Sequence, residues 1–257
     1  NPAGPGHWFY REWICKAQAR NLLHLRFFME DNPTLSQETR QRYERTFQGA
    51  FYRRFVLGEW TAAEGLVYDF FEESMVRPAP AEPADRWVIS CDYGTVNPTS
   101  MGLWGKWGGV WYRVQEYYYD ARAARRQQTD QEYAQRLREL AGGREIEAVV
   151  VDPSAASFLE VLRREGWHVR KADNEVLSGI RQTADALKQG KIVICPPCTD
   201  AIREFASYCW DLSAGDRDRV RKEFDHAMDE IRYFVATVVA PEEGEDLFFA
   251  GYVERHV

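Results

Sequence analysis

The spacing of apolar residues divides the region after residue 85 into a strand-rich part and a part that alternates helices with strands. Three apolar segments joined by short glycine-containing turns, at 86–93, 100–107 and 109–119, predict consecutive strands of an antiparallel meander. Tyr133, Leu137 and Leu140 recur at helical spacing and predict a helix over 129–141. The unbroken apolar run that ends before Asp152 predicts a fourth strand, buried on both faces.

The remaining pattern adds strand–helix units to this meander. It predicts helices over 155–165 and 176–189 and one that ends at 205, and strands over 168–171 and 191–195. Residues 208–223 read as a charged hairpin, and 225–239 as the last helix. Three antiparallel strands followed by strand–helix units predict an α/β fold, with a mixed sheet flanked by helices.

The N-terminal part is predicted to be a smaller segment. The pattern indicates a strand over 21–31, then a helix whose capping box is Thr34 and Gln37, then a short strand within 66–71. Residues 77–85 are rich in proline and form the clearest linker. We therefore expect an N-terminal piece over 1–76, too thin for an independent core, and a main domain over 86–257.

Composition restricts the class of protein. No apolar run approaches the roughly 20 residues of a membrane helix, so we expect a soluble protein that does not enter a membrane. Five cysteines at irregular spacing favour a reducing compartment, by default the cytoplasm. Cys195 and Cys198 would be half of a zinc site, but no second pair completes it. Because the chain begins with Asn1 rather than methionine, we expect a fragment.

Net charge argues against a simple nucleic-acid coat protein. The formal charge is −7, whereas such a protein is expected to be basic. A nucleic-acid enzyme remains open, because acids that bind divalent metals raise the negative count while the bound ions reverse its local sign.

Three acids stand at predicted element ends. Asp92 closes the first strand, Asp152 closes the fourth strand, and Asp229 lies one turn inside the last helix. Because the first and fourth strands of a mixed sheet are commonly neighbours, their terminal carboxylates are expected side by side, and their repulsion needs a cation. Hard oxygen ligands select Mg²⁺ or Mn²⁺, and two such ions about 4 Å apart support phosphodiester hydrolysis.

Each of these acids also has a simpler interpretation. Asp92 would serve as a turn former and Asp152 as a cap of the following helix. Asp225 and Asp229 lie four residues apart on one helical face, with His226 between them, yet Asp225 fits an N-cap equally well.

The segments CDYGTVNPTSM, VVVDPSAASF and DHAMDEIRY, in this order, resemble the three metal-binding motifs of the nuclease domain in large terminase subunits of tailed bacteriophages. NPAGPGHWFYREW resembles the end of the ATPase domain in the same family, and DNPTL and GEWTAAEGLVYDFF resemble the stretches after it. The resemblance covers nearly the whole chain.

The resemblance implies an RNase H-like nuclease that cuts concatemeric viral double-stranded DNA with two divalent ions. Asp92 would be the bridging ligand, and Asp152 and Asp229 would complete the metal sites. His226 would lie beside the metals and Asp225 would support them, while Arg232 and Tyr233 would orient the helix. Residues 1–76 would be the remnant of the ATPase domain with a connecting subdomain. Implied partners are DNA, the ATPase domain, the small terminase subunit and the procapsid portal, in the cytoplasm of the infected bacterium.

Other features complete the prediction. No phosphate-binding loop of the G-x-x-x-x-G-K-[ST] type occurs, so we expect no ATPase activity. Candidate DNA contacts on the charged hairpin are Arg217, Arg219, Arg221 and Lys222, for which a solvated surface is the alternative. Two other functions stay open: nucleotide binding of the actin and sugar-kinase type through the Asp-Tyr-Gly-Thr loop, and a non-catalytic module that docks on DNA or the portal.

Overall fold

The computed structural model describes residues 9–46, 52–53, 56–60, 65–211 and 218–241. Its contacts separate the chain into two units. The first contains Asn1–Asp69 and Tyr208–Glu223, and the second contains Phe70–Ser207 and Phe224–Val257. No helix in the described part of the chain has the length and apolar character needed to cross a membrane.

The second unit is built on a six-stranded mixed sheet in the order β5-β4-β1-β2-β3-β6. The strands are β1 (Arg86–Asp92), β2 (Thr99–Trp107), β3 (Val110–Tyr119), β4 (Ala148–Val151), β5 (Val169–Lys171) and β6 (Ile192–Ile194). β1, β2 and β3 form the predicted antiparallel meander. β4, β5 and β6 are added to it in parallel, as the mixed-sheet prediction requires.

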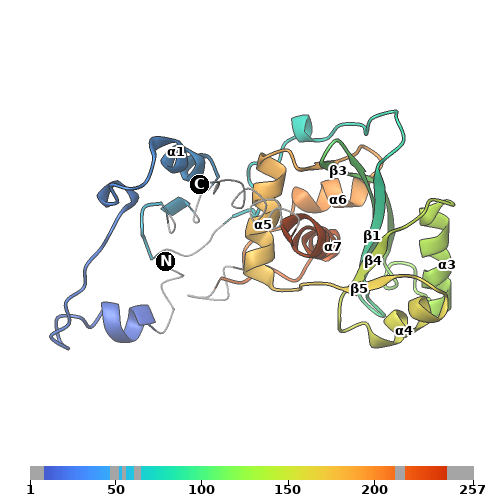
Figure 1. Ribbon diagram of the computed structural model, residues 1–257. Helices are drawn as coiled ribbons and strands as arrows, with labels where there is room; N and C mark the ends of the chain where they lie inside the picture. The colour runs from blue at the N-terminus through green and yellow to red at the C-terminus, as the bar shows by residue number, and fades with distance from the viewer. Residues whose placement is uncertain (1–8, 47–51, 54–55, 61–64, 212–217, 242–257) are drawn as a thin grey trace, which may run out of the picture. The chain divides into compact units, whose positions relative to one another are not determined.

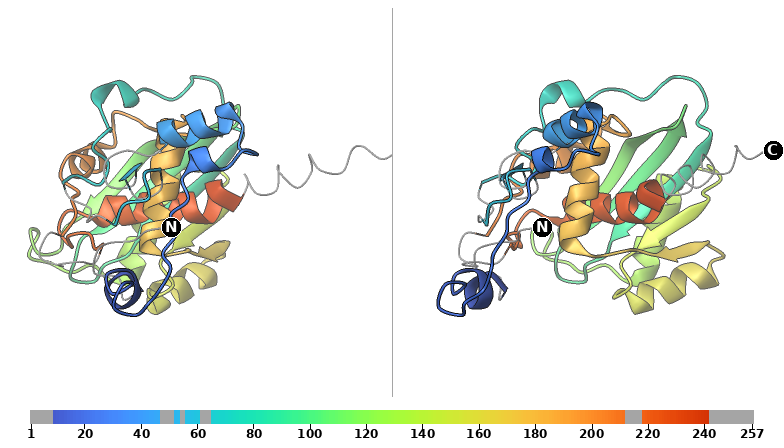
Figure 2. Two further views of the ribbon diagram at one scale, coloured as in Figure 1. Left: turned by 90° about the vertical axis from the view of Figure 1, so that its left-hand side faces the viewer. Right: turned by 60° about the vertical axis from the view of Figure 1, so that its left-hand side comes forward.

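Helices cover both faces of this sheet (Figure 1). α3 (Asp130–Ala141) and α4 (Ala156–Arg164) lie on one face. α5 (Val176–Lys188), α6 (Thr199–Phe205) and α7 (His226–Phe234) lie on the other. α7 crosses the face of the sheet (Figure 2) and continues as a π-helical turn, Val235–Val239. The helices predicted for this region are confirmed, with ends that differ by a few residues.

Alternation along the strands decides which side chains meet which helices. Ile89 and Cys91 of β1 belong to an apolar core with α3 and α4, together with Val149 and Val151 of β4. Ser90, Asp92 and the corresponding positions of neighbouring strands therefore face α7. This parity places the end of β1 and the end of β4 against the same helix.

A β-bulge in β3 changes the alternation in the middle of that strand. The pairing of β3 with β2 shifts between Leu103 and Trp104, which leaves Val114 as the additional residue. Arg113 before the bulge, and Glu116 and Tyr118 after it, consequently point to the same face, where they contact α6 and α7. Strict alternation along β3 would have separated Arg113 from Glu116.

The first unit departs more from the predictions. The helix after residue 34 exists as α1 (Gln37–Thr46), but its cap is Ser36, whose hydroxyl accepts from the N–H of Thr39 at 3.1 Å. Thr34 instead donates its N–H to the Asn32 side chain at 3.0 Å, so the predicted capping box is wrong. Asparagine forms such local turns readily, and this one moves the helix start by two residues.

Both strands predicted in this unit are also wrong. Residues 22–28 are irregular, with Leu23 and Phe27 about four-fifths exposed, and no described strand pairs with them. Residues 67–70 form a turn, and only Leu66 makes an isolated bridge, to Cys209. A run of apolar residues does not by itself specify a strand, because the backbone N–H and C=O groups of a strand need hydrogen-bond partners on a neighbouring strand. The charged hairpin is confirmed at its base, where Trp210 bridges Val220; residues 212–217 lie outside the described part.

Candidate metal-binding site

Two of the predicted acids lie on adjacent strands. β1 and β4 are parallel, and Cys91 is paired with Val151. Asp92 and Asp152 are the next residues along these two strands, and neighbouring strands are roughly 4.8 Å apart. The predicted neighbourhood of the first and fourth strands is thus confirmed.

Helix α7 brings a third acid and a histidine to the same place. α7 packs on β1, β2 and β4, and its first turn carries His226 and Asp229. His226 Nδ1 lies 2.9 Å from Asp92 Oδ2. Asp229 is buried, with 6% of its surface exposed, and the Arg232 guanidinium donates to its Oδ1 at 2.9 Å.

Tyr233, near the end of α7, links these groups. Its hydroxyl donates to Asp152 Oδ2 at 2.7 Å. Burial raises the pKa of Tyr233, and the charges of Asp92 and Asp229 raise it further. We name the set Asp92, Asp152 and Asp229 the acid edge.

The electrostatics of the acid edge are those of crowded, partly dehydrated carboxylates. Burial raises the pKa of Asp92 to about 6, with a further increase from the charge of Asp229, although the hydrogen bond from His226 opposes the shift. Burial acts to lower the pKa of His226, but the hydrogen bond and charge of Asp92 outweigh it, and the net shift is upward. Asp152 differs, since the Ser154 N–H and the Tyr233 hydroxyl overcome burial and lower its pKa.

Each carboxylate of the acid edge is turned toward a donor of the protein. Among the described residues, no three side chains of the His, Cys, Asp or Glu type are placed to hold one metal ion as they stand. The ligand types nevertheless suit a hard divalent cation, because all three are carboxylates from separate elements that meet at one sheet edge. Asp152 also keeps a local role: its Oδ1 accepts from the N–H of Ser154 at 2.7 Å, as in a turn.

Asp225 occupies the N-cap position of α7 but does not cap the helix with its side chain. Its Oδ1 lies 3.9 Å from Nε2 of His226, so the imidazole is placed between Asp225 and Asp92. The first-turn amides of α7 are bound by another carboxylate, Glu204 of α6.

The predicted DNA-contact residues belong to the first unit. Arg217 lies outside the described residues. Arg219 is 3.7 Å from Asp211, and Arg221 is 4.0 Å from Glu223, so two of these cations face acids of their own hairpin. Lys222 is exposed.

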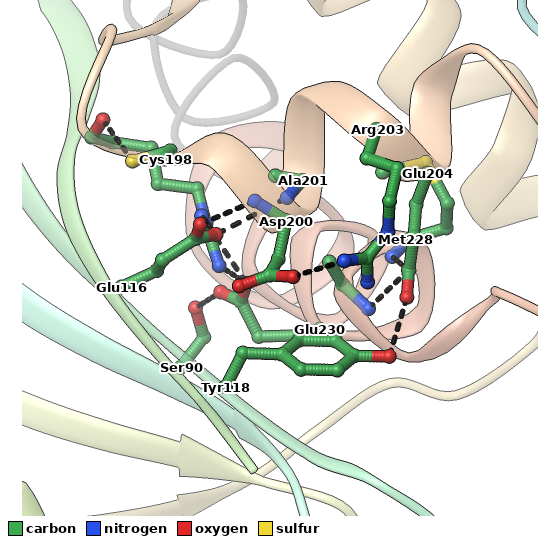
Figure 3. A network of polar contacts seen from close by, with 12 residues as sticks. Ser90, Glu116, Tyr118, Cys198, Asp200, Ala201, Arg203, Glu204, Met228 and Glu230 are labelled. Carbon is green, nitrogen blue, oxygen red and sulfur yellow. Dashed lines mark hydrogen bonds and ion pairs between the residues drawn. The ribbon is translucent and has the colours of Figure 1, made fainter. Parts of the chain in front are cut away.

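The sequence interpretation missed a cluster of buried charges behind the acid edge. Arg113 and Glu230 are fully buried and paired at 2.7 Å, and Arg113 also pairs with Glu116 at 2.6 Å. We name Arg113, Glu116 and Glu230 the ion-pair cluster. Ser90 donates to Glu230 (Figure 3). The Trp104 indole in turn donates to Ser90 at 2.8 Å. An arginine inside an aromatic strand was the available signal, because buried arginine requires acidic partners.

Cys198 is a buried thiol that is hydrogen-bonded to the backbone. Its thiol donates to the carbonyl of Arg113 at 3.0 Å, and burial raises its pKa to about 12. Such a thiol carries almost no thiolate at neutral pH.

Comparison with known proteins supplies relatives over most of the chain. No family model matches. The chain is 47% identical to a large terminase from a thermophilic bacteriophage, solved in complex with ADP, over 93% of this chain and 61% of that one, with a TM-score of 0.89. It is 22% identical over 222 residues to the large terminase subunit of Escherichia phage T5, covering 81% of this chain and 50% of that protein.

More distant solved structures agree in fold. The P22 large terminase nuclease domain has a TM-score of 0.54 at 17% identity, covering 67% of this chain and 91% of that domain. The nuclease of phage G20c with bound magnesium has a TM-score of 0.52 at 14% identity, covering 67% and 97%. The predicted RNase H-like fold is confirmed by these likenesses. The chain is homologous to the large terminase subunits of bacteriophages, and it spans half the length of the T5 protein and about three-fifths of the terminase solved with ADP.

Proposed function

We propose that the second unit is a divalent-metal-dependent DNA endonuclease that cuts viral double-stranded DNA during genome packaging. The observation that best supports this proposal is the proximity of Asp92, Asp152 and Asp229, at the ends of β1 and β4 and in α7. The chain is also homologous to large terminases. That the G20c nuclease was solved with magnesium supports the choice of ion.

The acid edge would hold two ions of Mg²⁺ or Mn²⁺, with Asp92 as the shared ligand. When bound, the ions would activate a water molecule and stabilise the leaving oxygen of the phosphodiester. An ionised carboxylate has more acceptor positions than the one bond from His226 or Tyr233 occupies, so Asp92 and Asp152 would bind the ions while these bonds hold their orientation. The products would be a 5′-phosphate and a 3′-hydroxyl.

The protein groups around the acid edge would act by orientation and charge. His226 Nδ1 is in hydrogen-bond contact with Asp92 Oδ2 and would fix the direction of that carboxylate. Arg232 pairs with Asp229 and is buried, so it would limit the rotation of Asp229. Tyr233 would do the same for Asp152 through its hydroxyl.

Sequence specificity is expected to be slight, because contacts to the backbone phosphates carry no direct base information. The proposed partners beyond DNA are the ATPase domain of a longer protein, a small terminase subunit and a procapsid portal. The proposed setting is the cytoplasm of the infected host.

The test is cleavage of supercoiled plasmid by the chain in the presence of Mn²⁺. We expect nicked and linear products, and loss of at least about a hundredfold in rate for Asp92→Ala, because removal of a ligand weakens the whole site. Circular dichroism and thermal unfolding would show that the variant keeps its fold. Cleavage that persists in Asp92→Ala, or that needs no divalent ion, would contradict the proposal.

The alternatives are separated by the same preparations. A kinase-like nucleotide site would show ATP binding that depends on the Asp-Tyr-Gly-Thr loop, without plasmid cleavage. A docking module would bind DNA equally well with and without Asp92 and would not cut it. ATP hydrolysis by the isolated chain should be absent, because it has no phosphate-binding loop of the P-loop type.

A further inference from the structure

The N-terminus of α7 is capped from another helix. Asp225 stands at the N-cap position, but its side chain makes no capping hydrogen bond. Glu204 of α6 takes over this function: its Oε2 accepts from the N–H of Ala227 at 2.7 Å and lies 3.4 Å from the N–H of Met228. These are the second and third residues of the helix, whose amides a capping group normally binds.

The Glu204 carboxylate is itself held in place. It is fully buried, and the Tyr118 hydroxyl of β3 donates to its other oxygen at 2.7 Å. Figure 3 shows the carboxylate between Tyr118 and the first turn of α7. α6 is fixed in the same way, because Glu116 of β3 accepts from the N–H of Asp200 at 2.6 Å. Two carboxylates in succession therefore tie β3 to α6 and α6 to α7.

The turn that Glu204 caps is the turn that carries the proposed site. His226 is the first residue of α7, and Asp229 follows three residues later with its N–H bonded to the Asp225 carbonyl at 2.7 Å. A free first turn would fray, and fraying would move His226 and Asp229 relative to Asp92, which is fixed at the end of β1. Charge also matters, since a carboxylate at a helix N-terminus interacts favourably with the helix dipole.

We infer that Glu204 is a positioning residue of the metal site: it fixes the first turn of α7, and thereby the separation between Asp229 and Asp92. This inference rests on the proposed function. Glu204 contacts neither metal nor DNA in this role. No sequence motif around Glu204 predicts the role.

The experiment uses a graded pair of variants, Glu204→Gln and Glu204→Ala, in the full chain. Glutamine keeps the shape and one acceptor oxygen but loses the charge, whereas alanine removes the cap. We expect the amide exchange of Ala227 and Met228 to rise by about tenfold in Glu204→Ala and less in Glu204→Gln, as for loss of a helix cap. The Mn²⁺ concentration that gives half-maximal binding, followed by titration calorimetry, should rise in the same order.

Glu175→Gln is the matched control. Glu175 is also a helix-capping carboxylate of this unit, which accepts from the N–H groups of Leu177 and Ser178 at the start of α5. α5 carries no residue of the acid edge, and the one bond from Glu175 toward it, from Arg232 to the Glu175 backbone carbonyl at 3.2 Å, does not involve the substituted side chain. The control should speed amide exchange in α5 and leave Mn²⁺ affinity unchanged, which separates positioning from a general loss of stability.

The outcomes distinguish this inference from the proposed function. Wild-type cleavage with unchanged Mn²⁺ affinity in Glu204→Ala would overturn the inference alone. Equal losses of affinity in Glu204→Gln and Glu175→Gln would also overturn it, because the effect would then be general. A wild-type chain that neither binds Mn²⁺ nor cuts DNA would overturn both.

Discussion

Glu230 of the ion-pair cluster and Asp92 of the acid edge lie on the same face of the sheet, yet their negative charges are compensated in opposite ways; Asp229, which pairs with the buried Arg232, resembles Glu230 in this respect. Glu230 and Asp229 are consecutive residues of α7. Glu230 receives a fully buried arginine, a serine hydroxyl and an indole N–H. Asp92, in the acid edge, has a histidine as its hydrogen-bond donor, and its pKa rises to about 6.

The difference separates a structural group from a group suited to an exchangeable ligand. Arginine stays charged at every accessible pH, so the compensation in the ion-pair cluster is permanent. Histidine changes its charge near neutral pH, so the compensation of Asp92 is conditional. A carboxylate with conditional compensation can be transferred to a cation at less cost than one fixed by arginine.

The largest effect should follow from breaking the ion-pair cluster. Arg113→Leu leaves two buried carboxylates without their cation, which typically costs about 3–5 kcal/mol. Urea unfolding should show a loss of this size in the free energy of unfolding. Arg163→Leu, a change at an exposed position of α4, is the control and should alter stability by less than about 0.5 kcal/mol. Similar stability of the two variants would mean that the cluster contributes no more than a surface charge.

Neutralising Asp92 of the acid edge should raise the stability of the fold instead of lowering it. In metal-free protein at pH 7, Asp92→Asn removes a carboxylate whose ionisation is unfavourable in the fold. We expect unfolding free energy to rise by about 1–3 kcal/mol, because each unit of pKa shift corresponds to about 1.4 kcal/mol. The same variant should lose nuclease activity. A destabilised Asp92→Asn protein would contradict the view that this carboxylate is strained without a cation.

The stability of the metal-free protein should depend on pH through Asp92. Since the folded-state pKa of Asp92 is raised to about 6, its contribution to metal-free stability is present at low pH and is lost as pH rises from about 4 to 6. The raised pKa of His226 acts in the same direction at higher pH. Mn²⁺ needs the ionised carboxylate, so its affinity should fall about tenfold from pH 7.5 to pH 5.

Thermal shift at the two pH values measures this dependence. Mn²⁺ should raise the melting temperature clearly at pH 7.5 and much less at pH 5. Asp92→Asn, as control, should show no pH-dependent gain from Mn²⁺ of this kind. Equal stabilisation of the wild-type chain at both pH values would show that Asp92 does not bind the ion.

The fold of the second unit was predictable because its signals are local. Apolar runs, glycine turns and helical spacing each occur within one element, and the order of elements then limits the possible sheets. The bulge at Val114 was not predictable, because it depends on how β3 pairs with β2. In the first unit the apolar run around Leu23 lacks a partner strand among the described residues, and the prediction failed there.

The candidate site was predictable only where its residues carry a local signal in the sequence. Asp92 and Asp152 end apolar strands and were visible as isolated acids, whereas Glu204 lies in an ordinary-looking helix. Its importance arises from Tyr118 and Ala227, which are 86 and 23 residues away in the chain. Contacts of this kind are set by packing rather than by a local pattern.

The smallest effect is expected for the basic side chains of the hairpin, and it sharpens the comparison between buried and exposed charge. Arg219 and Arg221 face Asp211 and Glu223 at 3.7 and 4.0 Å and are exposed, so Arg219→Gln with Arg221→Gln should change stability by less than about 1 kcal/mol. If they contact DNA phosphates, the slope of log affinity against log salt should become less negative by about 2, since each contact contributes about 0.9. Binding is measured in the Asp92→Asn background, where cutting does not interfere. An unchanged slope would assign both arginines to their own hairpin, and DNA binding by this chain would then depend on other cations.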